Sequence, residues 1–181
     1  MRAREKEAFG GVKVGAAFFG WLTAVGATVI LVAVVAAVAS ALDLSTTVDG
    51  STSSQDPSTL GLTKIIAGLV ILFVAYYCGG YVAGRMARFN GARQGVAVWL
   101  WAVILAAILT LIGVLFDTNS DLAQNVSLPD FRVDFDTVTA ETLIAIGIVL
   151  GVTLIGAIIG GLTGMRFHRR VDRAGFASDP Y

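Results

Sequence analysis

Four long stretches of the chain contain no Asp, Glu, Lys or Arg: Val14–Leu42, Ile65–Gly84, Gln94–Phe116 and Thr142–Met165. A helix needs about 20 predominantly apolar residues to cross a hydrocarbon core of about 30 Å, and each stretch is long enough. In lipid the backbone must satisfy its own hydrogen bonds, which a continuous apolar segment achieves as a helix. The stretches therefore predict four transmembrane helices, and the first is long enough to tilt or to protrude from the bilayer.

The composition points to the same class of protein. Hydrophobic residues make up 56% of the 181 residues and charged residues only 14%, against about 25% charged in a soluble domain. The fold class is therefore an all-α integral membrane protein. A single cysteine, Cys78, excludes an intrachain disulfide and a cysteine-based metal cluster, and a single histidine, His168, excludes a His-rich metal site.

Charge is strongly segregated along the chain. Residues 1–13, 85–93 and 166–181 contain eleven of the thirteen basic residues and four acidic ones. The other two connections, 43–64 and 117–141, contain two basic and nine acidic residues. Basic residues near the ends of spans stay on the cytoplasmic side. We therefore expect both termini in the cytoplasm, with 43–64 and 117–141 as acidic outer loops.

The first span has one alternative interpretation. A basic start, an apolar run and then Ala39-Ser40-Ala41 resemble a signal peptide with its small-residue cleavage site. The apolar region is much longer than the usual 7–15 residues or so. We expect the segment to be a retained transmembrane helix.

The two halves of the sequence match at an offset of eighty residues, which indicates an internal duplication. Repeat 1 would cover residues 14–92 and repeat 2 residues 93–165. Each repeat has two spans, so both would be parallel and related by an axis along the membrane normal. The prediction is a four-helix bundle made of two helical hairpins; chance matching of Gly/Ala-rich segments is the alternative. The matched pairs include Lys13 with Arg93, Gly15 with Gly95, Ala17 with Ala97, Phe19 with Trp99, Trp21 with Trp101, Gly80 with Gly160 and Gly84 with Gly164.

Glycines at a spacing of four residues predict close helix contacts, because small residues let helix backbones approach each other in lipid. On the fourth span, Gly156, Gly160 and Gly164 share one side, and Gly147 and Gly151 lie well over a right angle away. This predicts two contact faces for two neighbours; a glycine-lined conduit or an oligomer seam is the alternative. The predicted helix-packing residues are Gly80, Gly84, Gly147, Gly151, Gly156, Gly160 and Gly164.

The sequence shows no pattern typical of an enzyme. No span has an ionisable residue in its interior, where such residues mark proton relays and ion paths. Paired carboxylates, a nucleophile with its base, and a phosphate-binding loop are also absent from the sequence. We expect no catalytic residue, no cofactor, no metal and no nucleic-acid partner. Lys64 and Glu141, at the outer ends of their spans, are candidates for an ion pair worth about 0–1 kcal/mol.

Two tyrosines lie in the middle of the second span, beside Cys78. A buried tyrosine hydroxyl needs a partner, and we expect Tyr76 and Tyr77 to bond to Thr28, Thr110 or Thr153. The alternative is that they line a path for a polar permeant. In the second outer loop, the alternation in Phe131–Val138 predicts a short strand or an apolar edge.

The basic residues at the inner ends of the last three spans suggest one joint patch. The proposed repeat would place the inner ends of spans two and four symmetrically around the bundle. Such a patch would bind an anionic lipid headgroup or the acidic face of a partner subunit; the alternative is that these residues only set orientation. The patch residues are Arg85, Arg88, Arg93, Arg166, Arg169 and Arg170.

The second span ends in Gly79-Gly80, Ala83-Gly84 and Arg85, and the fourth ends in Gly160-Gly161-Leu-Thr-Gly164. With these motifs the chain resembles the four-span bacterial membrane proteins of the YrzE type, a family without an established function. The resemblance covers all four spans, although the outer loops here are longer and more acidic. It implies a fold and a location in the bacterial inner membrane, and it carries over no functional residues.

Abundant helix-contact residues beside absent reaction chemistry favour a non-enzymatic membrane protein. We expect a structural or accessory subunit of a larger complex, or a homo-oligomer held by glycine-rich helix contacts. The alternative is a small channel or carrier for a weakly charged solute. A broken helix or a polar stripe through mid-membrane would favour transport.

Overall fold

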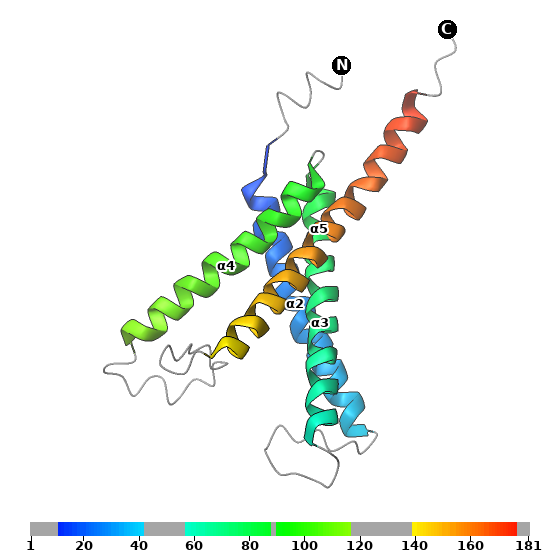
Figure 1. Cartoon of the computed structure of the whole chain (residues 1–181). Coiled ribbons are helices and arrows are strands. Elements are labelled where there is room, and N and C mark those ends of the chain that lie inside the picture. The colour runs from blue at the N-terminus through cyan, green and yellow to red at the C-terminus, as the bar shows by residue number, and fades with distance from the viewer. Residues whose placement is uncertain (1–10, 42–56, 88–89, 117–138, 177–181) are drawn as a thin grey trace.

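The computed structural model describes residues 11–41, 57–87, 90–116 and 139–176, with side chains described in 11–41, 61–87, 90–112 and 139–166. The helices, numbered as in Figure 1, are α2 (Val14–Ala41), α3 (Pro57–Met86), α4 (Gly91–Phe116) and α5 (Ala140–Phe176). All four are long and apolar enough to cross a membrane, which confirms the four predicted spans. The strand predicted at 131–138 lies outside the described residues.

Three of the helices begin at residues suited to a helix start. Pro57 opens α3, at a position where its missing N–H costs no hydrogen bond. The hydroxyl of Thr139 accepts the Thr142 N–H at 3.3 Å and so caps α5. The residue before α4, Asn90, has a φ of 63°, a left-handed conformation that asparagine tolerates better than most residues. Asn90 thus directs the backbone into the first turn of α4.

Two helices extend beyond the apolar spans that the sequence predicts. α5 continues to Phe176, although its apolar part is Ala140–Arg166. With 37 residues it is about 55 Å long at 1.5 Å per residue. α3 begins at Pro57, before the predicted start at residue 65. Charge marks where a span leaves the lipid, but the backbone hydrogen bonds of a helix continue through polar residues.

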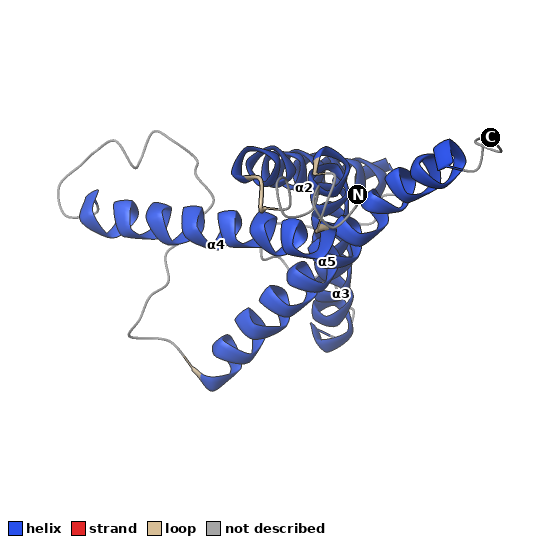
Figure 2. Cartoon of the chain, turned by 90° about the horizontal axis from the view of Figure 1, so that it is seen from above, coloured by secondary structure: helices blue, strands red, loops and turns tan. Residues whose placement is uncertain are grey.

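The helices converge at one end of the molecule and diverge at the other (Figures 1 and 2). The end with the α3–α4 turn, the start of α2 and the end of the apolar part of α5 is called the closed end here, and the opposite end the open end. α3 contacts α2, α4 and α5, and α4 also contacts α2 and α5. Within the described residues α2 and α5 do not contact each other. The bundle is therefore not a closed ring of four helices.

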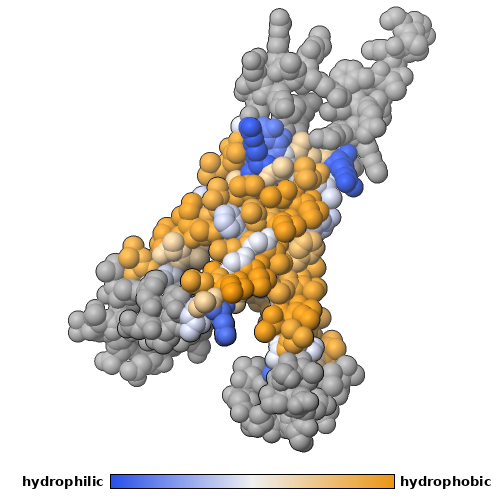
Figure 3. Space-filling model, in the orientation of Figure 1, coloured by the Kyte–Doolittle hydropathy of each residue, from blue (hydrophilic) through white to orange (hydrophobic). Residues whose placement is uncertain are grey.

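Burial follows this splayed shape. A small core of Ala17, Ala83 and Val98 lies near the closed end, and Trp21 and Trp101 pack against it. At the open end every residue of 139–150 is exposed. The visible surface is largely apolar (Figure 3), as expected for helices that face lipid.

The divergence of the helices also bears on the ion pair considered between Lys64 and Glu141. Both side chains are described and exposed, and no ion pair joins them in the described part of the chain. The prediction was wrong because α3 and α5 separate toward the open end (Figure 1), where these two residues lie.

Candidate functional site

The seam between α3 and α5 is built on backbone contacts that only glycine permits. A Cβ added to Gly80 would collide with the carbonyl group of Ala157. A Cβ added to Gly160 would collide with the carbonyl group of Tyr77. A shift of eighty residues converts one contact into the other, because it exchanges 80 with 160 and 77 with 157.

One turn closer to the closed end, the same relation recurs. Gly84 lies against the carbonyl group of Gly161, and a Cβ on Gly164 would come within 2.5 Å of the Tyr81 carbonyl oxygen. These two contacts are again exchanged by eighty residues. The predicted glycines of α3 and the closed-end half of α5 thus all lie at contacts between the two helices.

α4 packs against the neighbouring side of α5 through two glycines that the sequence analysis missed. A Cβ on Gly91 would collide with the carbonyl oxygen of Gly161, and one on Gly95 with that of Ala157. The Gly91 N–H also donates a hydrogen bond to Sδ of Met165. The four-residue spacing of Gly91 and Gly95 is the same signal that identified the other packing glycines.

The α2–α3 contact is formed differently. A Cβ on Gly20 would lie 2.6 Å from the Gly79 carbonyl oxygen, and Gly79 packs in turn against Gly20 and Ala24. Gly15, which the eighty-residue offset pairs with Gly95, has nothing within 4 Å of a built Cβ. The two hairpins therefore pack in different registers, and the contacts that the eighty-residue offset exchanges lie between α3 and α5.

The two predicted packing glycines at the open end meet no other helix among the described residues. A Cβ on Gly147 or Gly151 would have no neighbouring atom within 4 Å. Every closed-end glycine of the same helix would collide with backbone. The small face that these two residues form on α5 is therefore uncovered.

The start of α2 is fastened to the start of α4 by one side chain, which the sequence analysis also missed. Gln94 is only 1% exposed. Its Oε1 accepts the Lys13 N–H at 3.2 Å, and its Nε2 donates to the Lys13 carbonyl oxygen at 2.6 Å. The only signal in the sequence is an amide residue at the beginning of an apolar span.

Below this fastening, aromatic rings join the same two helices. The ring of Phe18 stands edge-on to Trp101 with centroids 5.5 Å apart, and lies 5.8 Å from Trp21. Such pairs contribute about 0.5–1.5 kcal/mol beyond their buried area. The α2–α4 contact at the closed end is thus held by an amide clamp and by aromatic packing.

The threonines predicted to bond to the mid-membrane tyrosines donate their hydroxyl protons within their own helices. Thr28, Thr110 and Thr153 each donate to the carbonyl oxygen four residues back in their own helix, a bond that threonine makes readily in helices. Within the described residues, the hydroxyl groups of Tyr76 and Tyr77 make no hydrogen bond. The predicted bonds from the tyrosines to these threonines are absent from the described part of the chain, and Thr153 accepts the indole N–H of Trp99 instead.

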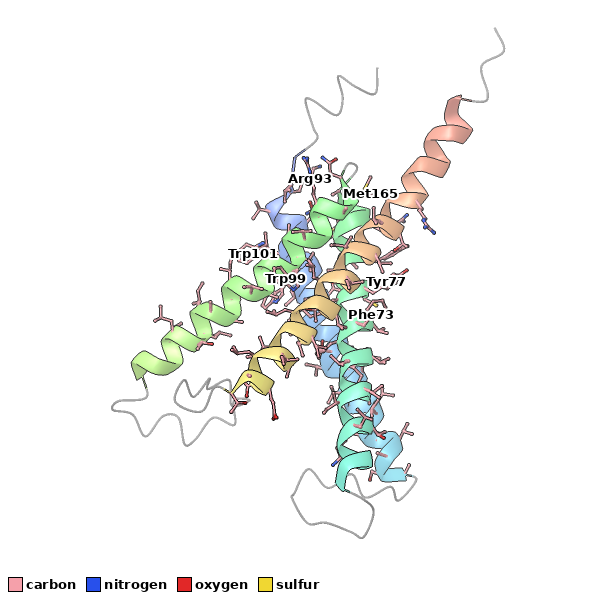
Figure 4. All side chains as sticks on the ribbon, viewed as in Figure 1. Phe73, Tyr77, Arg93, Trp99, Trp101 and Met165 are labelled. Atoms are coloured by element: carbon pink, nitrogen blue, oxygen red, sulfur yellow. The ribbon has the colours of Figure 1, made fainter. Side chains whose placement is uncertain are left out.

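The predicted basic patch is described only in part. Arg93 and Arg166 are exposed, Arg85 is half-buried, Arg88 is outside the described residues, and only the helical backbone is described for Arg169 and Arg170. Figure 4 shows Arg93 and Met165 at the closed end, near the α3–α4 turn. Lys13, also exposed, joins them there through the Gln94 clamp.

No group of three His, Cys, Asp or Glu residues among the described ones is placed to hold a metal ion. No family model matches the sequence, and no similar protein was found among curated proteins or solved structures.

Proposed function

We propose that this chain is a non-enzymatic protein of the bacterial inner membrane, with both termini in the cytoplasm. In this proposal it works as a structural or accessory subunit that associates with a second copy of itself through its helices. The four apolar helices support the membrane location, and the charge segregation of the sequence supports the orientation. The Gly79–Arg85 motif supports membership of the YrzE-type family.

One observation carries the proposed association: the contrast between the two halves of α5. Toward the closed end its glycines are fully used in contacts with α3 and α4. Toward the open end Gly147 and Gly151 are uncovered, and residues 139–150 are exposed on all sides. Glycine at a four-residue spacing weakens a lipid-facing helix unless a backbone packs against it. A second helix is the partner that such a face fits.

The packing of α3 against α5 suggests how a second helix could pack on this face. Both helices run in the same direction, and each presents glycines to carbonyl groups of the other. A twofold axis along the membrane normal would bring α5 of a second copy parallel to the first. Gly147 and Gly151 would then face the same two residues of the partner copy.

The proposed duplication is consistent with the glycine–carbonyl contacts between α3 and α5. The reciprocal contacts of Gly80 with Ala157 and of Gly160 with Tyr77 support an origin of both hairpins in one ancestral unit. The different packing of Gly15 and Gly95 suggests that the hairpins diverged afterwards. A parallel association of hairpins inside one chain would then resemble the association between two chains.

Cysteine cross-linking tests the proposed interface. In a Cys78→Ala background, Ile144→Cys places a thiol near the face of Gly147 and Gly151, and Val149→Cys places one on the opposite face of the helix. Both native side chains are exposed. In native membranes, mild oxidation should give a disulfide-linked dimer of the Ile144→Cys chain only, because a disulfide needs Cα atoms about 4.4–6.8 Å apart.

The Val149→Cys control distinguishes a specific dimer interface from random collision. Equal cross-linking at both positions would indicate random collision, and no cross-link at either would contradict the interface. Cross-linking of the Ile144→Cys chain to a different protein would show an accessory subunit in a heteromeric complex, and would contradict self-association.

The alternative function is a small channel or carrier for a weakly charged solute. It is favoured by the hydroxyl groups of Tyr76 and Tyr77, which have no hydrogen-bond partner in the described part of the chain. The four described helices are uninterrupted, which favours the packing role. Solute-driven swelling of proteoliposomes that is lost on Tyr76→Phe, with unchanged protein insertion, would favour the alternative.

A further inference from the structure

Two exposed cations, Lys13 and Arg93, flank the Gln94 clamp at the closed end. Arg93 precedes Gln94 in the chain, and Gln94 is bonded to the backbone of Lys13 through both its oxygen and its nitrogen. The clamp uses only the N–H and carbonyl groups of Lys13, so its side chain remains exposed, as does that of Arg93. Figure 4 shows Arg93 beside the start of α2. The distance between the two helix starts is thereby fixed by a nearly inaccessible side chain.

An apolar surface continues from these cations along α2. Val14 is 62% exposed and Phe18 is 37% exposed, and their spacing of four residues places them on one face of the helix. The Phe18 ring is fixed by its edge-on contact with Trp101. The surface therefore changes, within about two helical turns, from two positive charges to valine and aromatic side chains.

No acidic side chain is described at the closed end. Among the residues with described side chains the one acid is Glu141, which lies at the open end. An anion at Lys13 and Arg93 would meet no described carboxylate.

We propose that Lys13 and Arg93, positioned by Gln94, bind the phosphate of one anionic phospholipid, whose acyl chain lies along Val14 and Phe18. Arginine binds phosphate oxygens in a bidentate manner, and lysine adds a second charge. The apolar surface favours a lipid over free phosphate or an acidic protein, because only a lipid carries a hydrocarbon chain next to its phosphate. This proposal rests on the membrane location proposed above and is independent of the self-association.

Native mass spectrometry of the full-length chain in mild detergent tests the site, with phosphatidylglycerol as the probe and phosphatidylcholine as its zwitterionic control. Lys13→Gln and Arg93→Gln should each weaken phosphatidylglycerol binding about fivefold, and the double variant more. Lys13→Gln keeps the clamp, since the clamp uses only backbone groups of that residue. Arg166→Gln is the comparison variant, because it removes one exposed charge of the wider predicted patch, on α5 and outside the proposed site.

A Gln94→Leu variant separates a built site from general surface charge. It keeps every charge but releases the two helix starts, so binding should weaken although the net charge is unchanged. If the Gln94→Leu variant is unstable, comparing the phosphatidylglycerol binding of Lys13→Gln with that of Arg166→Gln still distinguishes a built site from general surface charge.

Three outcomes would overturn the proposal. An equal loss in Lys13→Gln, Arg93→Gln and Arg166→Gln would show a diffuse electrostatic effect. Full competition by inorganic phosphate would show a site for a free anion. Loss of a copurifying acidic protein, with unchanged phosphatidylglycerol binding, would show a protein interface. The cross-linking result at Ile144 is expected to be the same in all these variants, so the two proposals fail separately.

Discussion

The indole N–H of Trp99 donates a hydrogen bond of 3.2 Å to the hydroxyl of Thr153, which joins α4 to α5 in mid-membrane. The same hydroxyl donates to the carbonyl oxygens of Val149 and Leu150 in its own helix, at 2.8 and 3.1 Å. Thr153 is 4% exposed, so its donor and its acceptor capacity are both used away from water. Figure 4 shows Trp99 at about the level of Phe73 and Tyr77, where the helices begin to separate.

This bond should stabilise the α4–α5 contact measurably. Hydrogen bonds between transmembrane helices contribute about 0.6 kcal/mol on average and up to about 1.7 kcal/mol. We expect Trp99→Phe and Thr153→Val each to lower the thermal stability in detergent. In a double-mutant cycle the combined variant should lose less than the sum of the two. Additive losses would show that the bond contributes nothing of its own.

A second prediction concerns the α3–α5 seam. Gly160→Leu would push the backbone of α5 away from the Tyr77 carbonyl group, at a cost of about 1–3 kcal/mol by the estimate for overpacked cores. Gly147→Leu on the same helix meets open space, so the unfolding temperature of the dissociated chain should stay close to that of the wild type. Equal destabilisation by both variants would contradict the assignment of Gly160 to a tight contact.

The sequence predicted the helices well because the physical constraint is strong. A bilayer admits an apolar run such as Gln94–Phe116 almost only as a helix, and α4 covers it. Gly80 and Gly84, which the four-residue spacing selected, lie against the backbone of α5, and a missing side chain in lipid is useful mainly where a backbone packs. The glycine spacing could not predict which helix packs against these residues.

The contacts that sequence reasoning missed depend on position rather than on residue type. Nothing in the spacing of Gln94 indicates that its amide reaches the backbone of a residue 81 positions away. The absent pairing of Lys64 with Glu141 also depends on position. Their nearly equivalent places in the two proposed repeats indicate a similar depth in the membrane, but not the angle between α3 and α5. In the tyrosine prediction, the sequence did not show that the hydroxyl of Thr153 accepts the indole N–H of Trp99 from α4.

The orientation of the chain is the third prediction. In a Cys78→Ala background, single cysteines at Ser53 and Ser120 should react with a membrane-impermeant thiol reagent added to intact cells. Cysteines at Asn90 and Ser178 should react only after the cells are opened, because the basic connections stay in the cytoplasm. Labelling of Asn90→Cys in intact cells would reverse the proposed topology.

The last prediction concerns the stability contributed by the Gln94 clamp. Removal of the amide in Gln94→Leu leaves the Lys13 N–H without its partner at the edge of the membrane, and an unpaired polar group there costs about 1–3 kcal/mol. The Lys13 carbonyl oxygen loses one of two bonds, because it still accepts the Ala17 N–H. Lys13→Gln keeps both backbone bonds, so it should leave the unfolding temperature nearly unchanged. Thermal unfolding in a single neutral detergent, without added lipid, measures both variants free of any effect of lipid binding. A loss in Lys13→Gln as large as that in Gln94→Leu would mean that the lysine side chain, rather than the amide clamp, fastens α2 to α4.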